Sequence, residues 1–336
     1  MYVLPINRKD VYIRVKKTTF FFFFNWGLKK LKRLTTSVIF GDLTSLLIYL
    51  YGIVSGQSVR MSGNHIYDFF MGSLLYPRMF GDRVDIKMIS EVRWSWLSLF
   101  VITLSCALKS WQQYHTVTPN LLFLLLAHWL YSNACVKGEH YIPYFWDMYY
   151  EKYGWMLNFW NITGVPFLYC FQSLYVYRNH ASIVALQQTD LTYYLAHLFV
   201  CLLLLCGGYY IWDCANGQKA DFKNPQLRKF TKFPNLPHST IDDAKYIETH
   251  DGRKLMIDGF WKYARKMNYT GDICMGLSWG LICHFQSFLP YFYVTFFVCM
   301  ALHRFRRDDQ KCAKNYGKKW EEYKKVVPYT LIPGLV

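Results

Sequence analysis

The sequence predicts an all-α protein: a polytopic membrane helical bundle with a helical block at its C-terminal end. The first reason is composition. The 336 residues are 53% hydrophobic and 20% aromatic, which is richer in bulky apolar side chains than an ordinary soluble domain. The second reason is that apolar stretches recur, several of them reaching or approaching the about 20 residues needed to cross a bilayer. Repeated stretches of this length favour a lipid environment.

Six apolar stretches supply the predicted membrane helices. The first five cover residues 36–51, 94–108, 121–136, 155–176 and 191–212. The sixth, at 273–303, is interrupted by Pro290, which removes a backbone donor, and by the turn-forming sequence Ser-Phe-Leu-Pro. This last stretch is therefore predicted to form a helical hairpin.

Composition divides the chain into three regions. Residues 1–34 contain a phenylalanine run followed by a basic run, and we interpret them as a low-complexity N-terminus without a cleavable signal peptide. Residues 35–215 hold the first five apolar stretches. Residues 216–336 are dense in charged and aromatic side chains, so the chemistry is expected there. The start of this region, 216–254, contains three prolines and is predicted to be mostly loop.

The net charge of +16 is unevenly placed, because Lys and Arg concentrate at 29–33, 219–232, 253–266 and 304–325. Basic segments next to membrane helices usually face the cytoplasm, which explains such clusters as topology signals. The alternative is binding of a polyanion such as a dinucleotide phosphate. Binding of nucleic acid is not expected, because no soluble basic domain is predicted.

A polar and aromatic stripe leads into the sixth apolar stretch. Its members recur at about one helical turn: Trp261, Arg265, Asn268, Tyr269 and Asp272. This spacing predicts one face of a helix. Polar groups at membrane depth usually face a protein interior or a water-filled cavity. The stripe is expected to line a ligand site, with hydrogen bonding between helices as the alternative.

A second stripe follows the hairpin. It consists of Arg304, Asp308, Lys311, Cys312 and Asn315, on a predicted helix that ends at Gly317. Beyond it, Trp320 and Tyr323 form an aromatic pair that is expected either to stack on a planar ring or to anchor the chain at the membrane interface.

Lys219 and Lys223 lie one helical turn apart just after the fifth apolar stretch. Two ammonium groups at this spacing suit a phosphate, and they suit the positive-inside rule equally well.

Several common sites have no signature here. The ten cysteines form no C-x-x-C pair and are predicted to be reduced and structural. The ten histidines form no H-x-x-H or H-x-x-x-H pair, so no histidine-ligated metal site is expected. No G-x-G-x-x-G follows a strand, which argues against a Rossmann unit.

The C-terminal motifs closely resemble those of the sterol reductase family. They are "ANGQKADF", "GFWKYARKMNYTGD", "LPYFY" and "HRFRRDDQKCAKNYGKKWEEYKKVVPY". Upstream, "YDFFMGSLLYPR", "DIKMISEVRWSW" and the long run that begins "KGEHYIPYFWDMYYEKYGW" resemble the branch that reduces the C-24(28) bond in ergosterol synthesis. The resemblance covers about residues 66–336.

The resemblance implies a multi-pass enzyme of the endoplasmic reticulum membrane that reduces a sterol double bond with NADPH. Residues 35–215 would form the sterol-binding transmembrane region, and 216–336 the NADPH-binding and catalytic region. A sterol substrate, contact with membrane lipid and association with other enzymes of sterol synthesis are the expected partners. Relatives begin with additional membrane helices, so the resemblance implies either a truncated sequence or a reduced member.

The family's NADPH contacts carry over onto ten positions: Lys219, Lys223, Trp261, Asn268, Tyr269, Arg304, Asp308, Cys312, Tyr316 and Tyr323. Many relatives have arginine in place of Lys223, so the charge is kept while the bidentate fork is lost. A family tyrosine proposed as a proton donor matches Tyr131 by its spacing to Glu139 and Asp147.

An unactivated alkene accepts hydride poorly, so protonation should come first and hydride second. Asp308 is the predicted acid, because a carboxyl group in an apolar pocket can remain protonated near neutral pH. The alternative is a salt bridge between Asp308 and Arg304, one turn earlier.

Three other functions remain open at this point. One is a sister activity, reduction of a C-14 or C-7 sterol bond. The second is an S-adenosylmethionine-dependent membrane methyltransferase of the isoprenylcysteine type, whose C-terminal rhythm is similar. The third is a non-catalytic sterol-binding or scaffold protein.

Overall fold

The computed structural model describes residues 35–81, 83–139, 142–226 and 240–335. The described chain is predominantly helical, which confirms the predicted all-α class, and contains two small antiparallel sheets of two strands each. Two compact units are present. The first comprises residues up to Pro77 together with Lys152–Gly164, and the second comprises Arg78–Glu151 and Val165–Val336.

The first unit contains the helix Thr35–Val54, α2 (His65–Met71) and α7 (Trp155–Phe159). Asn158 fastens α7 to the long helix, because its Nδ2 donates to the Gly41 carbonyl at 3.0 Å and to the Ser45 hydroxyl at 2.8 Å. A buried amide with these partners avoids the cost of an unpaired polar group inside an apolar helix pair.

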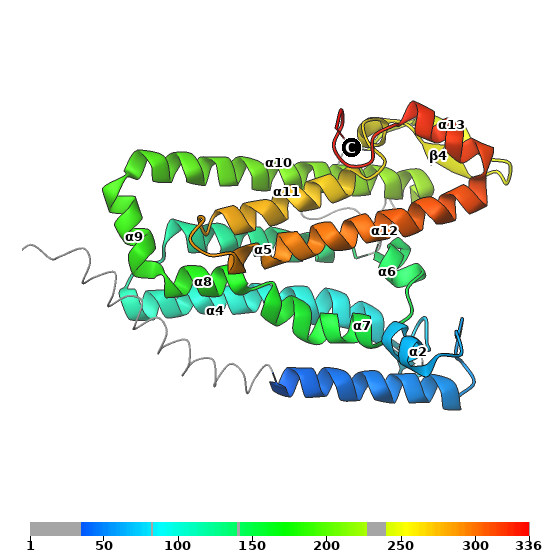
Figure 1. The fold of residues 1–336 in the computed structure, drawn as a ribbon, viewed down its shortest axis with the longest axis horizontal. Helices are drawn as coiled ribbons and strands as arrows, with labels where there is room; N and C mark the ends of the chain where they lie inside the picture. Colours follow the sequence, from blue (N-terminus) through cyan, green and yellow to red (C-terminus); the bar gives the residue numbers. More distant parts are fainter. Residues whose placement is uncertain (1–34, 82, 140–141, 227–239, 336) are drawn as a thin grey trace, which may run out of the picture. The chain divides into compact units, whose positions relative to one another are not determined.

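The second unit contains most of the secondary structure (Figure 1). Its first half consists of β1 (Arg78–Met79), β2 (Val84–Asp85), α3 (Ile86–Met88), the π-helical η1 (Ile89–Trp96), α4 (Leu97–Tyr114), α5 (Pro119–Lys137), η2 (Ile142–Tyr144) and α6 (Trp146–Tyr149). After η3 (Trp160–Leu168), which passes from the first unit into the second, come α8 (Phe171–Arg178), α9 (His180–Thr189) and α10 (Leu191–Lys223). The C-terminal part consists of β3 (Tyr246–Glu248), β4 (Lys254–Met256), η5 (Gly259–Lys262), α11 (Met267–Leu281), η6 (Leu289–Tyr291), α12 (Phe292–Tyr316) and α13 (Lys318–Val326).

Three described helices are long and apolar enough to cross a membrane: Thr35–Val54, Ile86–Tyr114 and Leu191–Lys223. They match three of the predicted stretches and agree with a multi-pass membrane protein. The stretch 155–176 is divided among α7, η3 and α8, with Pro166 inside η3. The predicted hairpin at 273–303 is confirmed, since α11 and α12 flank a turn that contains Pro290.

Helices α10 and α11 pack against each other extensively and lie side by side (Figure 1). Two glycines permit the approach. A Cβ on Gly271 would lie 2.6 Å from the Gly208 carbonyl oxygen, and a Cβ on Gly208 would lie 2.8 Å from the Gly271 carbonyl oxygen. Small residues at such positions let two backbones meet without side chains between them. The contact places Trp212 of α10 directly against Gly271.

Two local predictions differ from the structure. Residues 216–223, the start of the segment 216–254 that was predicted to be mostly loop, continue α10. The continuation is stabilised by tertiary contacts such as the hydrogen bond from the Phe260 amide to Gln218 Oε1 at 3.0 Å. The stripe that begins at Trp261 is also not one helical face, because Trp261 lies in η5 and α11 begins only at Met267.

Candidate functional site

The second predicted stripe does form one helical face. Arg304, Asp308 and Cys312 follow each other at single turns of α12, which ends at Gly317 with a φ of 50°. Gly317 can adopt this left-handed conformation without the cost that a Cβ would add. The prediction of this helix and of its end is confirmed.

Ion pairs and a cation–π contact join the short helix α6 and the residues after it to this face of α12. Arg304 makes a two-pronged ion pair with Asp147, with Nη1 2.8 Å from Oδ2. Arg307 donates to Glu151, just after α6, at 2.7 Å. The ammonium of Lys311 lies 4.1 Å from the centre of the Tyr150 ring, a cation–π contact. The partner of Arg304 is therefore Asp147, and the alternative that paired it with Asp308 was wrong.

Asp308 instead forms an ion pair with Lys266, which directly precedes α11. Burial alone would raise the pKa of Asp308, but the Lys266 ammonium outweighs burial and, with Lys219 and Lys311 nearby, holds the pKa below its usual value. The same pair raises the pKa of Lys266. The expected apolar pocket with a protonated Asp308 is thus absent from the described structure, because cations surround this carboxylate.

Four lysines gather around Asp308, and we call them the lysine cluster: Lys219, Lys223, Lys266 and Lys311. The Lys219 ammonium lies 3.9 Å from the centre of the Trp261 ring, whose Nε1 donates to the Ala215 carbonyl at 2.8 Å. The last turn of α10 thereby presents its charge to α12. Four lysine side chains around one carboxylate make this a basic site, which suits an anion that carries phosphates.

Asn268 and Tyr269 stand in the first turn of α11 beside this cluster. Asn268 Nδ2 donates to Asn216 Oδ1 at 3.2 Å, while its Oδ1 has no hydrogen-bond partner among the described residues although it is buried. A buried acceptor without a donor favours a ligand that supplies an N–H or O–H group. The amide, the tyrosine and the lysine cluster together fit a dinucleotide, which carries phosphates, hydroxyls and an amide.

The C-terminal aromatic residues pack on the protein itself. Trp320 and Tyr323 of α13 stack on each other with ring centres 5.0 Å apart. Both are buried with Val327 in a cluster that Cys312 and Tyr316 also contact. Burial raises the pKa of Tyr323 to about 12. Cys312 therefore packs against this aromatic cluster. Two of the predicted NADPH contacts, Tyr316 and Tyr323, belong to it.

Arg265, a member of the first predicted stripe, has a different task. It donates to the carbonyls of Val327 and Pro328 at 2.9 and 2.7 Å and to the Thr330 hydroxyl at 2.9 Å. Its own amide and that of Lys266 donate to the same C-terminal segment. Arg265 therefore fixes the C-terminal tail and the position of Lys266 next to it.

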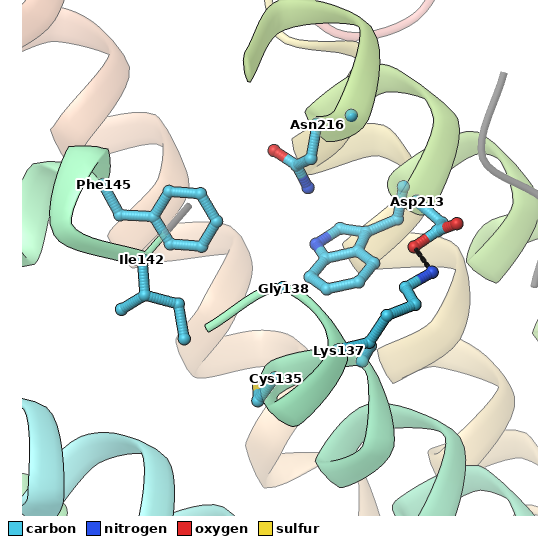
Figure 2. A pocket seen from close by; sticks show the side chains of 10 residues that line it. Cys135, Lys137, Gly138, Ile142, Phe145, Asp213 and Asn216 are labelled. Carbon is cyan, nitrogen blue, oxygen red and sulfur yellow. Dashed lines mark hydrogen bonds and ion pairs between the residues drawn. The ribbon is translucent and has the colours of Figure 1, made fainter. Parts of the chain in front are cut away.

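A pocket lies between the C-terminal end of α5, residues 212–217 of α10, η2 and Phe145, which precedes α6 (Figure 2). It is lined by Ala134, Cys135, Lys137, Gly138, Ile142, Phe145, Trp212, Asp213, Asn216 and Gly217. Most of the lining is apolar, and the buried ion pair of Lys137 and Asp213 lies on one side of it. Asn216 joins the pocket to the predicted cofactor residues, because it accepts the hydrogen bond from Asn268.

Tyr131 lies on α5 one turn before the pocket-lining residues and is 8% exposed. Three tryptophan rings surround it, with ring centres at 4.4 Å for Trp96, 5.6 Å for Trp212 and 5.8 Å for Trp279. Its hydroxyl also faces the carboxylate of Asp272, on α11. Tyr131 thus contacts α10 at Trp212, whereas Lys219 and Lys223 of the lysine cluster follow Asn216 on the same helix.

The sequence did not single out Lys266, Asp147 or Glu151 as site residues. Lys266 could have been noticed because it lies inside a basic segment and follows Arg265 directly. The partnership of Asp147 with Arg304 spans 157 residues, and no local pattern signals it.

Comparison with known proteins agrees with these features. The profile of the Ergosterol biosynthesis ERG4/ERG24 family matches residues 13–336. The chain belongs to this family. Among ERG4/ERG24 relatives, a protein of Aspergillus fumigatus, "Delta(24(24(1)))-sterol reductase erg4A", is 43% identical over 305 residues. A "Delta(24(24(1)))-sterol reductase" of Gibberella zeae is 41% identical over 306 residues, and a "Delta(14)-sterol reductase" of Dictyostelium discoideum is 33% identical over 304. The predicted family is confirmed.

These ERG4/ERG24 relatives are longer than the chain. The matches cover 89%, 90% and 90% of this chain but 63%, 50% and 62% of the respective relatives. The chain therefore spans between half and two thirds of the length of these curated relatives.

Proposed function

We propose that the chain reduces a sterol carbon-carbon double bond with NADPH, and that this bond is C-24(28). The observation that carries the proposal is the pocket of Figure 2, which connects two chemically different regions. On one side Trp212 joins it to the buried Tyr131 and Asp272. On the other side Asn216 joins it to Asn268 and the lysine cluster. An apolar space between an acid and a cofactor site suits saturation of an apolar alkene.

The cofactor side is assigned to NADPH, which when bound supplies hydride. The lysine cluster would hold its phosphates, Asn268 Oδ1 would accept from an N–H or O–H group, and Trp261 and Tyr269 would border its rings. The side of the site formed by α12 and α13 would contribute Arg304, Cys312, Tyr316 and Tyr323. The basic lysine cluster favours NADPH over NADH, because the additional phosphate of NADPH brings further negative charge that lysines can bind.

The acid side is assigned to Tyr131. The sequence favours Asp308 as the acid, yet Asp308 forms an ion pair with Lys266 inside the lysine cluster, which favours its ionised form. Tyr131 is beside the apolar pocket and carries an O–H group sheltered by aromatic rings. Asp308 is accordingly proposed to order the lysine cluster, and Tyr131 to deliver the proton.

The substrate class rests on the relatives. Two of those described above carry the name of Delta(24(24(1)))-sterol reductase and are more similar to the chain than the Delta(14)-sterol reductase is. We infer from this difference that the C-24(28) bond is reduced rather than C-14 or C-7. The endoplasmic reticulum membrane, sterol binding by residues 35–215 and association with other enzymes of sterol synthesis are part of the same proposal.

The test is a reduction assay on the full chain in isolated membranes. A 24(28)-methylene sterol is supplied with NADPH, NADH or S-adenosylmethionine, and the sterol products are identified by mass spectrometry. NADPH-dependent loss of the 24(28) double bond supports the proposal. Reduction only of C-14 or C-7 unsaturated sterols would assign a sister activity, and methyl transfer would assign the chain to a different reaction class.

A further inference from the structure

Asp272 is a buried carboxyl group beside Tyr131, and the proposed function gives it no role of its own. It is 7% exposed on α11, one turn after Asn268, and its Oδ1 has no hydrogen-bond partner among the described residues. The polar side chains next to its carboxylate are those of Tyr131 and Trp212, and neither carries a positive charge. A carboxyl group buried without a cation favours its neutral, protonated form, because an unpaired charge is costly inside a protein.

The fold holds Asp272 in this position. Gly271, its neighbour, is in direct backbone contact with α10 and leaves no room for a Cβ, which would lie 2.7 Å from the Trp212 amide nitrogen. This contact sets the carboxyl group against the indole of Trp212. Asp272 thus cannot move away from α10 without separating α10 from α11.

The same contact places Asp272 at the pocket. Trp212 is both a polar neighbour of Asp272 and part of the pocket lining. Tyr131 packs on Trp212 with ring centres 5.6 Å apart. The carboxyl, the phenol and the pocket are therefore neighbours.

We propose that Asp272 supplies the proton that Tyr131 delivers to the sterol double bond. This inference rests on the proposed reduction. In the step, the Tyr131 O–H proton forms a bond with one alkene carbon while the carboxyl proton of Asp272 passes to the tyrosine oxygen. The other alkene carbon becomes a cation and accepts the hydride. Asp272 ends as a carboxylate, which regains its proton from solvent before the next turnover.

The pair overcomes a weakness of each member acting alone. A phenol is a weak acid, and a tyrosinate left in an aromatic cage would be an unpaired buried charge. Transfer of the carboxyl proton leaves the tyrosine neutral throughout. The charge remains instead on a carboxylate next to the Trp212 N–H and the Tyr131 O–H, which stabilise it.

Asp272→Asn tests the proposal, since asparagine keeps the size and the acceptor oxygen but has no acidic proton. Single-turnover reduction is measured in membranes beside direct titration with NADPH. We expect the rate to fall by about 100-fold or more, the usual range for a general acid, with NADPH affinity and melting temperature close to wild type. Asp272→Glu, which restores an acidic proton, should recover part of the rate.

A double variant separates a shared proton path from two independent effects. Because the two residues act as one unit, Asp272→Asn combined with Tyr131→Phe should be no slower than the slower single variant. Asp243→Asn is the matched control, because Asp243 is exposed and has a φ of 52°, a conformation that asparagine also accepts.

Three results would overturn the assignment: a near wild-type rate for Asp272→Asn, a loss of rate matched by loss of NADPH binding or folding, or multiplicative effects in the double variant. Failure of the proposed function would look different. In that case the wild-type chain would reduce no sterol while still binding NADPH, and the variants would show no change to compare.

Discussion

Two carboxyl groups of this protein, Asp308 and Asp272, lie in opposite surroundings. Asp308 is surrounded by the lysine cluster and makes an ion pair with Lys266, so its pKa is held below the usual value. Asp272 is buried beside the aromatic side chains of Tyr131 and Trp212, which are neutral. The first environment stabilises a carboxylate and the second a carboxylic acid. The difference teaches that the identity of a proton donor depends on the neighbours of a carboxyl group rather than on its place in a motif.

The largest expected effect is that of Tyr131→Phe. Removing only the hydroxyl leaves the aromatic packing in place but removes the proposed donor beside the pocket. Single-turnover sterol reduction should fall by about 100-fold or more. The NADPH dissociation constant, measured on the same membranes, should stay unchanged. A Tyr131→Phe enzyme with near wild-type turnover would show that Tyr131, beside Asp272, is not the proton donor.

Gly271→Ala should weaken the contact between α10 and α11 that holds Asp272 beside Trp212. The added Cβ would lie 2.6 Å from the Gly208 carbonyl oxygen, so α10 and α11 must separate. Overpacking of this kind costs about 1–3 kcal/mol, and the melting temperature and the rate should drop together. Gly207→Ala is the matched control, because a Cβ there meets no atom within 4 Å. If both variants melt alike, the close helix contact does not position Asp272.

Lys266→Met tests whether the lysine cluster around Asp308 binds NADPH. Loss of one charge-assisted hydrogen bond costs about 1.5–3 kcal/mol, so NADPH should bind about tenfold weaker or worse. Lys262→Met is the control, because Lys262 is exposed in η5 and lies over Tyr263 at 4.9 Å. Titration with NADPH and NADH is the measurement. An equal loss for both cofactors would place Lys266 on a phosphate that they share, and no loss would leave it as a partner of Asp308 alone.

Asp308→Asn should have the smallest effect on turnover, well under the about 100-fold expected for an acid. Since the pKa of Asp308 is depressed in the folded protein, its stabilising contribution is present above the ordinary aspartate value and is lost as pH falls through the folded pKa. Below about pH 4, the difference in melting temperature between the wild type and the variant should therefore become smaller. A hundredfold loss of single-turnover rate at unchanged NADPH affinity would return the acid role to Asp308.

Local patterns predicted much of the fold. The apolar stretches anticipated the long helices, Pro290 anticipated the hairpin, and Gly317 anticipated the end of α12, because these signals act over one or two helical turns. These local patterns did not predict the secondary structure where a contact distant in sequence stabilised it. Residues 216–223 read as loop but continue α10, since Gln218 is held by the backbone of η5.

The sequence by itself determined the helical membrane class, the family motifs and the face of α12 that carries Arg304, Asp308 and Cys312. Only the tertiary structure decided which charges meet. Asp308 met Lys266 rather than Arg304, which lies one turn away on its own helix, because α11 and the C-terminal tail bring Lys266 to α12 while α6 brings Asp147 to Arg304. Spacing along one helix fixes which side chains share a face. The protonation of a carboxyl group, however, depends on burial and on charges from other helices, and those are set only when the helices pack.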